Sequence, residues 1–227
     1  KGSLEQKLIF GNYPQVYTAT SDNARILVLE NIRDGYLLKD LLVFDNIKGN
    51  AFIINLLRLI AFQIGNEVSY SEIGRALKAD TKTVQRYLDL LEKMYVLFSL
   101  NGYSRNMRKE YTKSPRYYFW DNGIRNAVIS NFNNLNQRDD IGKLWENYCV
   151  SERLKRNHYL QNRVNSFFWR TYDQKEIDYV EEKENQITGY EIKLNNSKST
   201  GGKAFLSAYE NSSTEVINPE NILEFIL

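Results

Sequence analysis

Two short stretches in the last third of the chain carry acidic and basic residues at a spacing suited to phosphodiester chemistry. Asp178 lies in one stretch, and Glu191 and Lys193 form a Glu-x-Lys in the next. Carboxylate oxygens hold hard divalent cations, and magnesium or manganese is the expected ion for an oxygen-only ligand set. A lysine beside the metal can orient water or stabilise charge that develops on phosphate. The spacing therefore indicates a metal-dependent phosphodiesterase site with Asp178 and Glu191 as the metal ligands.

A two-residue turn at positions 184–185 would place both stretches in one hairpin. Pairing then runs with a constant index sum, so that Asp178 lies opposite Glu191. Alternation predicts an apolar face and a polar face. The apolar face comprises Ile177, Tyr179, Tyr190 and Ile192, and the polar face comprises Asp178, Glu191 and Lys193. Like charges placed opposite each other favour a bound cation, but any half-buried hairpin has a solvated polar face, so both interpretations stay open.

Composition narrows the class of protein. The 227 residues suffice for one large domain or two small ones, and 30 basic against 28 acidic side chains leave a net charge of +2. A single cysteine, Cys149, rules out an internal disulfide framework and is expected in the core, and a single histidine, His158, rules out multi-histidine metal sites. Apolar runs are too short to span a membrane, and no signal peptide is evident. A cytoplasmic protein without a membrane partner is expected.

The middle of the chain has the pattern of a helix-turn-helix. After a helical stretch at residues 51–64, Ser69 and Glu72 form a capping box that opens a short helix to residue 78, with Ile73, Ala76 and Leu77 expected inside. Asp80 is the expected N-cap of a second helix over residues 81–94. Its predicted buried face comprises Val84, Tyr87, Leu88 and Leu91.

The opposite face of this second helix is suited to duplex DNA. Lys82, Gln85 and Arg86 lie in its first turns, where a recognition helix contacts the major groove. Two β-like segments, residues 96–100 and 116–120, flank a basic loop and suggest a wing. The basic residues of this region are Arg105, Arg108, Lys109, Lys113 and Arg116. Asp89 and Glu92 on the same helix oppose DNA contact, and charged loops are commonly only solvated.

The second half of the chain reads as an α/β unit. A polar, Asn-rich linker is expected at residues 131–140 and a long amphipathic helix at 141–159. Strands are predicted at residues 167–171, 177–180, 187–194 and 215–218, with a flexible loop at 195–202 and a helix at 203–209. The predicted fold class is therefore α+β or α/β, with a helical winged-helix domain followed by a restriction-endonuclease-like α/β domain.

Several short motifs occur in the order seen in a family of prokaryotic AAA-type ATPases, and the chain resembles the C-terminal region of that family, which carries the domain DUF4143. The motifs are Gly11-Asn12-Tyr13-Pro14-Gln15-Val16, Tyr36-Leu37-Leu38-Lys39-Asp40, Thr83-Val84-Gln85-Arg86-Tyr87-Leu88, Lys113 to Gly123, Trp145-Glu146-Asn147-Tyr148, Trp169-Arg170, Glu176-Ile177-Asp178 and Glu191-Ile192-Lys193. The last four resemble elements of the PD-(D/E)XK nuclease fold.

The resemblance implies a domain layout. Residues 1–40 would be a remnant of the ATPase lid with a connecting helix, 41–130 the winged helix, and 140–227 the nuclease-like domain. The chain departs from the ATPase pattern because neither of its Gly-Lys pairs belongs to a phosphate-binding loop. ATP would therefore bind only in a preceding ATPase domain, which would also be a partner.

The resemblance also implies roles for individual residues. Glu146 would be a helix acid that supports the metal, with Glu152 as a substitute on another face of the same helix. Asp178 would be the principal ligand and Glu191 the second, and Lys193 would orient water or stabilise charge. Nuclease-like activity is an expectation by analogy of fold.

Two hypotheses remain open. In the first, the winged helix holds double-stranded DNA and the nuclease-like domain cuts it. In the second, the chain is a catalytically silent interaction or sensor module of the ATPase. The complete Asp…Glu-x-Lys set favours the first, and the near-zero net charge favours the second. The oligomeric state is not determined by the sequence.

Overall fold

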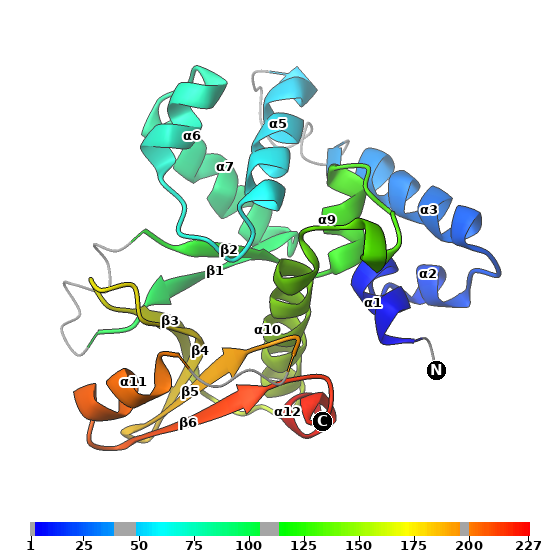
Figure 1. Ribbon diagram of the computed structural model, residues 1–227. Coiled ribbons are helices and arrows are strands. Elements are labelled where there is room, and N and C mark those ends of the chain that lie inside the picture. Colours follow the sequence, from blue (N-terminus) through cyan, green and yellow to red (C-terminus); the bar gives the residue numbers. More distant parts are fainter. Residues whose placement is uncertain (1–2, 39–48, 105–113, 196–199) are drawn as a thin grey trace. The chain divides into compact units, whose positions relative to one another are not determined.

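A computed structural model describes the chain at residues 3–38, 49–104, 114–195 and 200–227 (Figure 1). The chain divides into two compact units. Unit 1 comprises residues 1–98 and 117–144, and unit 2 comprises residues 99–116 and 145–227. The predicted mixed class of helices and strands is confirmed. Within the described ranges, no helix combines the length and apolar character needed to cross a bilayer.

Unit 1 is largely helical. Its elements are α1 (Leu4–Phe10), α2 (Pro14–Thr18), α3 (Asp22–Asn31), the π-helical segment η1 (Ile32–Leu38), α5 (Gly49–Phe62), α6 (Tyr70–Leu77), α7 (Thr81–Lys93), α9 (Asn122–Val128) and the 3-10 turn η2 (Leu135–Gln137). Buried polar contacts join them. Arg125 on α9 donates to the carbonyl of Ala61 and pairs with Asp140 at 2.5 Å, and Arg138 pairs with the same carboxylate at 2.8 Å. The Asn-rich segment is thus bound to α9, and Arg125 also joins α9 to α5.

The connection between α1 and α2 is fixed to the start of α9, beside which α1 lies (Figure 1). Asp121 caps α9 through the N–H of Ile124 and also accepts a hydrogen bond from the N–H of Asn12 at 2.7 Å. Gly11 has a φ of 72°, and a Cβ on it would lie 2.0 Å from the Asp121 carboxylate. Only glycine meets both the backbone and the steric requirement at this position.

Helices α6 and α7 follow the predicted pattern closely. Ser69 accepts from the N–H of Glu72 and Asp80 accepts from the N–H of Thr83, so both predicted N-caps are confirmed. The predicted inner face of α7 is buried: Val84, Tyr87, Leu88 and Leu91. The prediction that Ala76 points inward is wrong, because α6 buries Ile73 and Gly74 and leaves Ala76 exposed.

A six-stranded sheet has the order β2-β1-β3-β4-β5-β6. Its strands are β1 (Leu97–Gly102), β2 (Arg116–Phe119), β3 (Asn165–Arg170), β4 (Glu176–Lys183), β5 (Gln186–Ile192) and β6 (Ser212–Ile217). The central strands β3, β4 and β5 are antiparallel, whereas β1 and β6 each join them in parallel. The sequence predicted a wing flanked by residues 96–100 and 116–120. In the structure β1 also pairs with β3, through Asn101 and Gly102, and is therefore part of the larger sheet.

Three helices complete the described part of unit 2. Helix α10 covers Ile141–Tyr159, as predicted, although its first turn belongs to unit 1. Helix α11 (Gly202–Ala208) packs on one face of the sheet through Phe205, which joins Ile177, Val180 and Ile187 in a buried cluster. A terminal helix α12 (Ile222–Ile226), which the sequence did not predict, places Phe225 against Tyr190.

The predicted register of the β4–β5 hairpin is confirmed over the pairs from Tyr179–Tyr190 to Lys183–Gln186. Glu184 and Asn185 both have positive φ, as a two-residue turn of this kind requires. The predicted apolar face is wrong at Ile177. The pairing of β3 with β4 shifts by one residue between Phe167 and Trp169, and this bulge places Ile177 with Val180 instead of with Tyr179.

The turn between α6 and α7 gives a test of the packing. A Cβ on Gly74 would lie 2.7 Å from the carbonyl oxygen of Ala79. We expect Gly74→Ala to lower the free energy of unfolding by about 1–3 kcal/mol, as overpacking does elsewhere. Urea unfolding measures this change. Gly35→Ala is the control, because a Cβ there meets nothing within 4 Å; equal effects of both substitutions would contradict the described turn.

Candidate active site

Asp178 is buried at the bulge of β4, with 7% of its surface exposed. Its Oδ2 accepts a hydrogen bond of 2.7 Å from the N–H of Ile192 on β5. The carboxylate therefore accepts a hydrogen bond from a backbone N–H of β5 at the point where the regular β4–β5 pairing ends. Burial raises the pKa of Asp178 to about 7, the charge of Glu146 adds to the rise, and the Ile192 N–H, Lys193 and Arg116 oppose it.

Glu191 is almost completely enclosed, at 1% exposure, and its carboxylate is held by the segment that begins α11. Oε1 accepts from the N–H groups of Gly201 and Gly202 at 3.0 and 2.9 Å. Oε2 accepts from the N–H and the hydroxyl of Thr200 at 2.9 and 3.3 Å. Lys193 adds an ion pair at 3.7 Å. Four donors fill the four lone-pair positions that a carboxylate offers.

Lys193 lies at the end of the same strand. Its side chain is 27% exposed, and its carbonyl oxygen accepts a hydrogen bond of 3.1 Å from the indole of Trp145. Trp145 directly precedes Glu146 on α10. This bond fixes the Glu-x-Lys strand to the helix that carries the fourth predicted residue.

Glu146 is the helix acid that faces inward. It is 6% exposed, and its charge contributes to the raised pKa of Asp178. Glu152, the substitute considered from the sequence, pairs with Lys155 at 2.6 Å, and its side chain is 21% exposed. Cys149 is fully buried on the same helix, as expected, and burial raises the pKa of its thiol. The structure thus buries Glu146, Asp178 and Glu191 and leaves Lys193 partly buried, which does not fit a solvated polar face.

A divalent cation held by both Asp178 and Glu191 does not fit this arrangement. The oxygens of Glu191 are occupied by Thr200, Gly201 and Gly202, and hard cations need direct carboxylate oxygens. Among the described residues, no group of three or more His, Cys, Asp or Glu side chains is arranged to hold a metal ion. The carboxylates stabilise the fold in this conformation, and no hydrolytic step follows from it.

Arg116 does not belong to the exposed basic surface that the sequence suggested. It is 3% exposed, pairs with Glu176 at 2.7 Å, and its guanidinium carbon lies 4.4 Å from the ring centre of Phe168. Arg116, the first residue of β2, is therefore a buried structural cation of unit 2.

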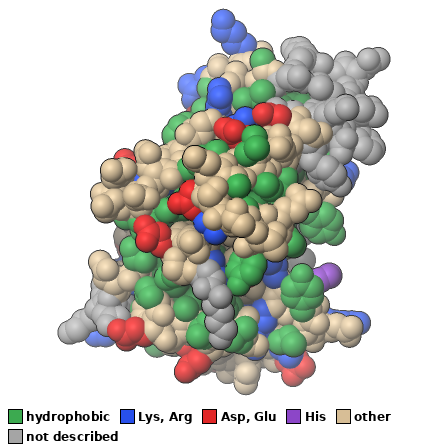
Figure 2. All heavy atoms as spheres, turned by 90° about the vertical axis from the view of Figure 1, so that its right-hand side faces the viewer, with side chains coloured by type: hydrophobic (Ala, Val, Ile, Leu, Met, Phe, Trp, Pro, Cys, Tyr) green, Lys and Arg blue, Asp and Glu red, His purple; other side chains and the backbone are tan. Residues whose placement is uncertain are grey.

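The candidate nucleic-acid residues on α7 are exposed: Lys82, Gln85 and Arg86 lie on the side opposite the buried face. Asp89 is also exposed on this helix. Arg105, Arg108 and Lys109 lie outside the described residues, as does Lys113. On the side of the molecule drawn in Figure 2, acidic and basic side chains are interspersed among hydrophobic and neutral ones, in line with the net charge of +2.

Sequence reasoning missed a buried polar network between α10 and the sheet. Arg153 makes two hydrogen bonds to Glu181, of 2.8 and 2.7 Å, and donates to the carbonyl of Phe225 at 2.7 Å. Asn157 and Tyr179 also donate to Glu181. Although burial alone would raise it, Arg153 holds the pKa of Glu181 below its ordinary value. Glu182 and Lys183 follow Glu181 in the strand, so its neighbours in the sequence do not distinguish it from an exposed acid.

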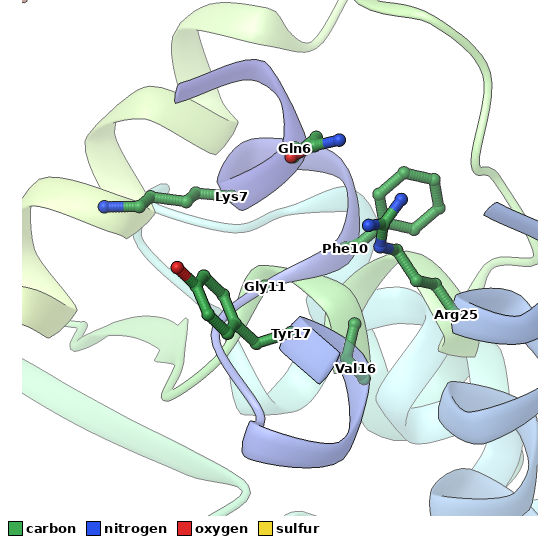
Figure 3. Close-up of a pocket in the computed structure, with 7 residues that line it drawn as sticks. All are labelled: Gln6, Lys7, Phe10, Gly11, Val16, Tyr17 and Arg25. Carbon is green, nitrogen blue, oxygen red and sulfur yellow. The ribbon is translucent and has the colours of Figure 1, made fainter. Parts of the chain in front are cut away.

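A cavity of about 280 Å³ lies in unit 1, between α1, α2 and α3 (Figure 3). It is lined by Gln6, Lys7, Phe10, Gly11, Val16, Tyr17 and Arg25. Arg25 is fixed on its side of the cavity by Asp22 at 2.6 Å and by the carbonyl of Ala19. Lys7 and Tyr17 extend away from Arg25, so the polar ends do not converge on one point (Figure 3). None of the predicted catalytic residues lines this cavity.

Comparison with known families identifies both parts of the chain. Residues 1–136 match the family described as "Domain of unknown function (DUF8612)", and the chain belongs to this family. Residues 141–223 match "Domain of unknown function (DUF4143)", so the DUF4143 part of the expected resemblance is confirmed. No solved structure matches the chain significantly.

Curated relatives are distant. An uncharacterized protein of Mycobacterium tuberculosis is 26% identical over 191 residues, which is 83% of this chain and 42% of the relative. An uncharacterized protein of Haemophilus influenzae is 25% identical over 78% of this chain and 42% of the relative. An uncharacterized protein of Methanocaldococcus jannaschii is 25% identical over 95% of this chain and 48% of the relative. The chain spans less than half the length of these relatives.

Removal of the Glu191 carboxylate tests its structural role. We expect Glu191→Ala to lower the free energy of unfolding by about 2–4 kcal/mol, because the N–H groups of Gly201 and Gly202 lose their charged acceptor in a buried place. Urea unfolding followed by circular dichroism measures the loss. Exposed Glu210 is the control, and Glu210→Ala should change stability by less than about 0.5 kcal/mol. If Glu191→Ala leaves the free energy of unfolding unchanged, these contacts are absent.

The raised pKa of Asp178 predicts a pH dependence of stability. The folded state holds this proton up to about pH 7, whereas the unfolded chain releases it near the ordinary value of 3.8. The folded state binds more protons in this window, so the free energy of unfolding falls as the pH rises through it. We expect the stability of wild type relative to Asp178→Asn to fall from pH 4 to pH 7 by roughly 1 kcal/mol per pH unit or less. Urea unfolding at several pH values measures this, and a constant difference would contradict the assignment.

Proposed function

We propose that this chain is a nucleic-acid-associated module in which α6 and α7 act as a helix-turn-helix that binds duplex DNA. The observation that carries the proposal is the division of α7 into two sides. Val84, Tyr87 and Leu88 are buried, whereas the three candidate contact residues of the first turns are exposed. A capped, well-packed helix that presents such residues at its start fits the major groove.

Charge limits the contact to the start of the helix. Lys82 and Arg86 are one turn apart and can reach phosphates or base edges, and Gln85 between them can bond to adenine. Asp89 lies one turn further and would repel phosphate. The N-cap of α7 is Asp80, so the helix end itself is occupied by a side chain and contributes no phosphate site. We therefore expect duplex DNA to bind with moderate affinity, and we expect this affinity to fall steeply as the salt concentration rises.

The DUF4143 unit is nuclease-like in its residues, and we propose that it does not cleave DNA in the conformation described. The two oxygens of Glu191 accept four hydrogen bonds and Asp178 Oδ2 accepts one from the N–H of Ile192, so Glu191 has no oxygen left for a metal. Cleavage would need a rearrangement around Glu191. The proposed state of this unit is therefore the catalytically silent scaffold of the second hypothesis.

A second candidate function is a protein-interaction module of a larger ATPase. Its support is the length of the relatives, of which this chain covers 42–48%. That leaves room for an ATPase domain as a neighbour, as the family resemblance implies. Exposed residues of α7 would then contact protein instead of DNA.

DNA binding is tested by fluorescence anisotropy with a labelled duplex at several salt concentrations. We expect the double variant Lys82→Ala/Arg86→Ala to weaken binding by about tenfold or more and to reduce the salt slope by about 2, because two phosphate contacts are lost. Lys93→Ala is the control: it removes one positive charge from the last turn of α7, away from the proposed contact, and should leave binding nearly unchanged.

The same experiment separates the candidates. If wild type binds duplex DNA and the double variant binds equally well, the DNA contact lies elsewhere on the chain. If wild type does not bind duplex DNA at all, the protein-interaction module is favoured. Incubation of wild type with labelled duplex, branched and single-stranded DNA in manganese should give no cleavage. Cleavage that depends on Asp178 would overturn the proposal that the DUF4143 unit is catalytically silent.

A further inference from the structure

We propose that the cavity between α1, α2 and α3 of unit 1 binds a small linear dianion of the dicarboxylate class. The cavity measures about 280 Å³, just below the roughly 300–1,000 Å³ of sites for drug-sized ligands, so a smaller molecule fits it. None of its lining residues belongs to α7. The inference therefore goes beyond DNA binding and does not depend on it.

The charge of the cavity wall favours an anion. Two of the lining residues, Lys7 and Arg25, are cations, and none is an acid. A neighbouring cavity that shares two lining residues with the first has the opposite charge, since its wall includes Glu5 and Asp22 and no cation. A wall of one sign raises the local concentration of ligands of the other sign. The first cavity is therefore the one that attracts an anion.

Lys7 on α1 and Tyr17 on α2 form one end of the cavity. Both side chains extend away from Arg25, toward the left of Figure 3. Among the residues that the structure describes, neither the ammonium group of Lys7 nor the hydroxyl of Tyr17 has a hydrogen bond or an ion pair. A carboxylate accepts up to four hydrogen bonds, so one carboxylate can use both donors.

Arg25 on α3 forms the other end. It donates to Asp22 at 2.6 Å and to the carbonyl of Ala19 at 3.2 Å. A guanidinium has five N–H donors, so within the described part of the chain three remain for a ligand. The side chain of Asp22 is 65% exposed, and solvent weakens its compensation of the Arg25 charge. The two contacts hold the guanidinium in place, which lowers the entropy lost when a second carboxylate binds.

The wall between the two ends is largely apolar. Phe10 and Val16 are 6% and 1% exposed, and Gly11 adds no side chain. Gln6 has its Oε1 engaged by the N–H of Ser3 at 3.3 Å, so its amide N–H donors are what it can offer a ligand. A methylene chain suits such a wall. Because the cations lie at opposite ends, a dicarboxylate can reach both, whereas a monocarboxylate can reach one.

Isothermal titration calorimetry with the full chain tests the proposal. The probes are succinate, adipate and suberate, each compared with the monocarboxylate of the same chain length, namely butyrate, hexanoate and octanoate. We expect at least one dicarboxylate to bind about tenfold or more tightly than its monocarboxylate, because only the dicarboxylate forms charge-assisted hydrogen bonds at both ends.

Substitutions at the Lys7 end locate the binding. Lys7→Met keeps the length of the side chain and removes its charge, and it should weaken binding of the tightest dicarboxylate by about tenfold. Tyr17→Phe removes only a hydroxyl and should weaken binding by about threefold. Circular dichroism checks that both variants fold. Lys93→Met is the matched control, because Lys93 is an exposed lysine of unit 1 that does not line the cavity, and it should bind as wild type does.

Four results would overturn the proposal. The first is that no probe binds at concentrations on the order of 10 mM, and the second is that each dicarboxylate binds no more tightly than its monocarboxylate. The third is a folded Lys7→Met variant with the affinity of wild type. The fourth is an equal loss of affinity in Lys93→Met and Lys7→Met, which would show attraction to the overall charge of the protein. If Lys7→Met does not fold, Tyr17→Phe decides the question.

Discussion

The carboxylate of Glu191 connects the end of β5 to the start of α11, and much of unit 2 depends on how its charge is compensated. It is 1% exposed and accepts hydrogen bonds from Thr200, Gly201 and Gly202. A buried charge is tolerated only when donors surround it, so the segment before α11 must follow the carboxylate closely. This places Gly201 against the carbonyl of Glu176 and ties α11 to the sheet it covers.

Because the charge of Glu191 is compensated in this way, the chain can carry the residue types of a nuclease site without the free oxygens that a metal needs. The Asp…Glu-x-Lys set is complete and its two acids are buried, as is Glu146, yet Glu191 is saturated and Asp178 bonds to the N–H of Ile192. Burial raises the pKa of Asp178, and the charge of Glu146 adds to the rise because like charges repel. Residues that suit a metal in sequence can thus act as internal acceptors, and the backbone around them decides which role they have.

Local signals predicted local structure well. Ser69 and Asp80 cap their helices because a cap needs only the next three residues, and the turn at Glu184 and Asn185 set the hairpin register. Features set by distant residues were not predictable: the bulge that moves Ile177, the ion pair that buries Arg116, and the donors on Glu191. Thr200-Gly201-Gly202 looked like a flexible loop, since nothing nearby in sequence shows an enclosed carboxylate.

Amide hydrogen exchange at Gly201 and Gly202, measured by nuclear magnetic resonance, tests the central claim most directly. Both N–H groups should be protected in wild type and should lose that protection in Glu191→Gln, whose neutral side chain is a weaker acceptor with fewer free lone pairs. Exchange of both amides in wild type at the rate of an unstructured peptide would show that Glu191 is not held by this segment.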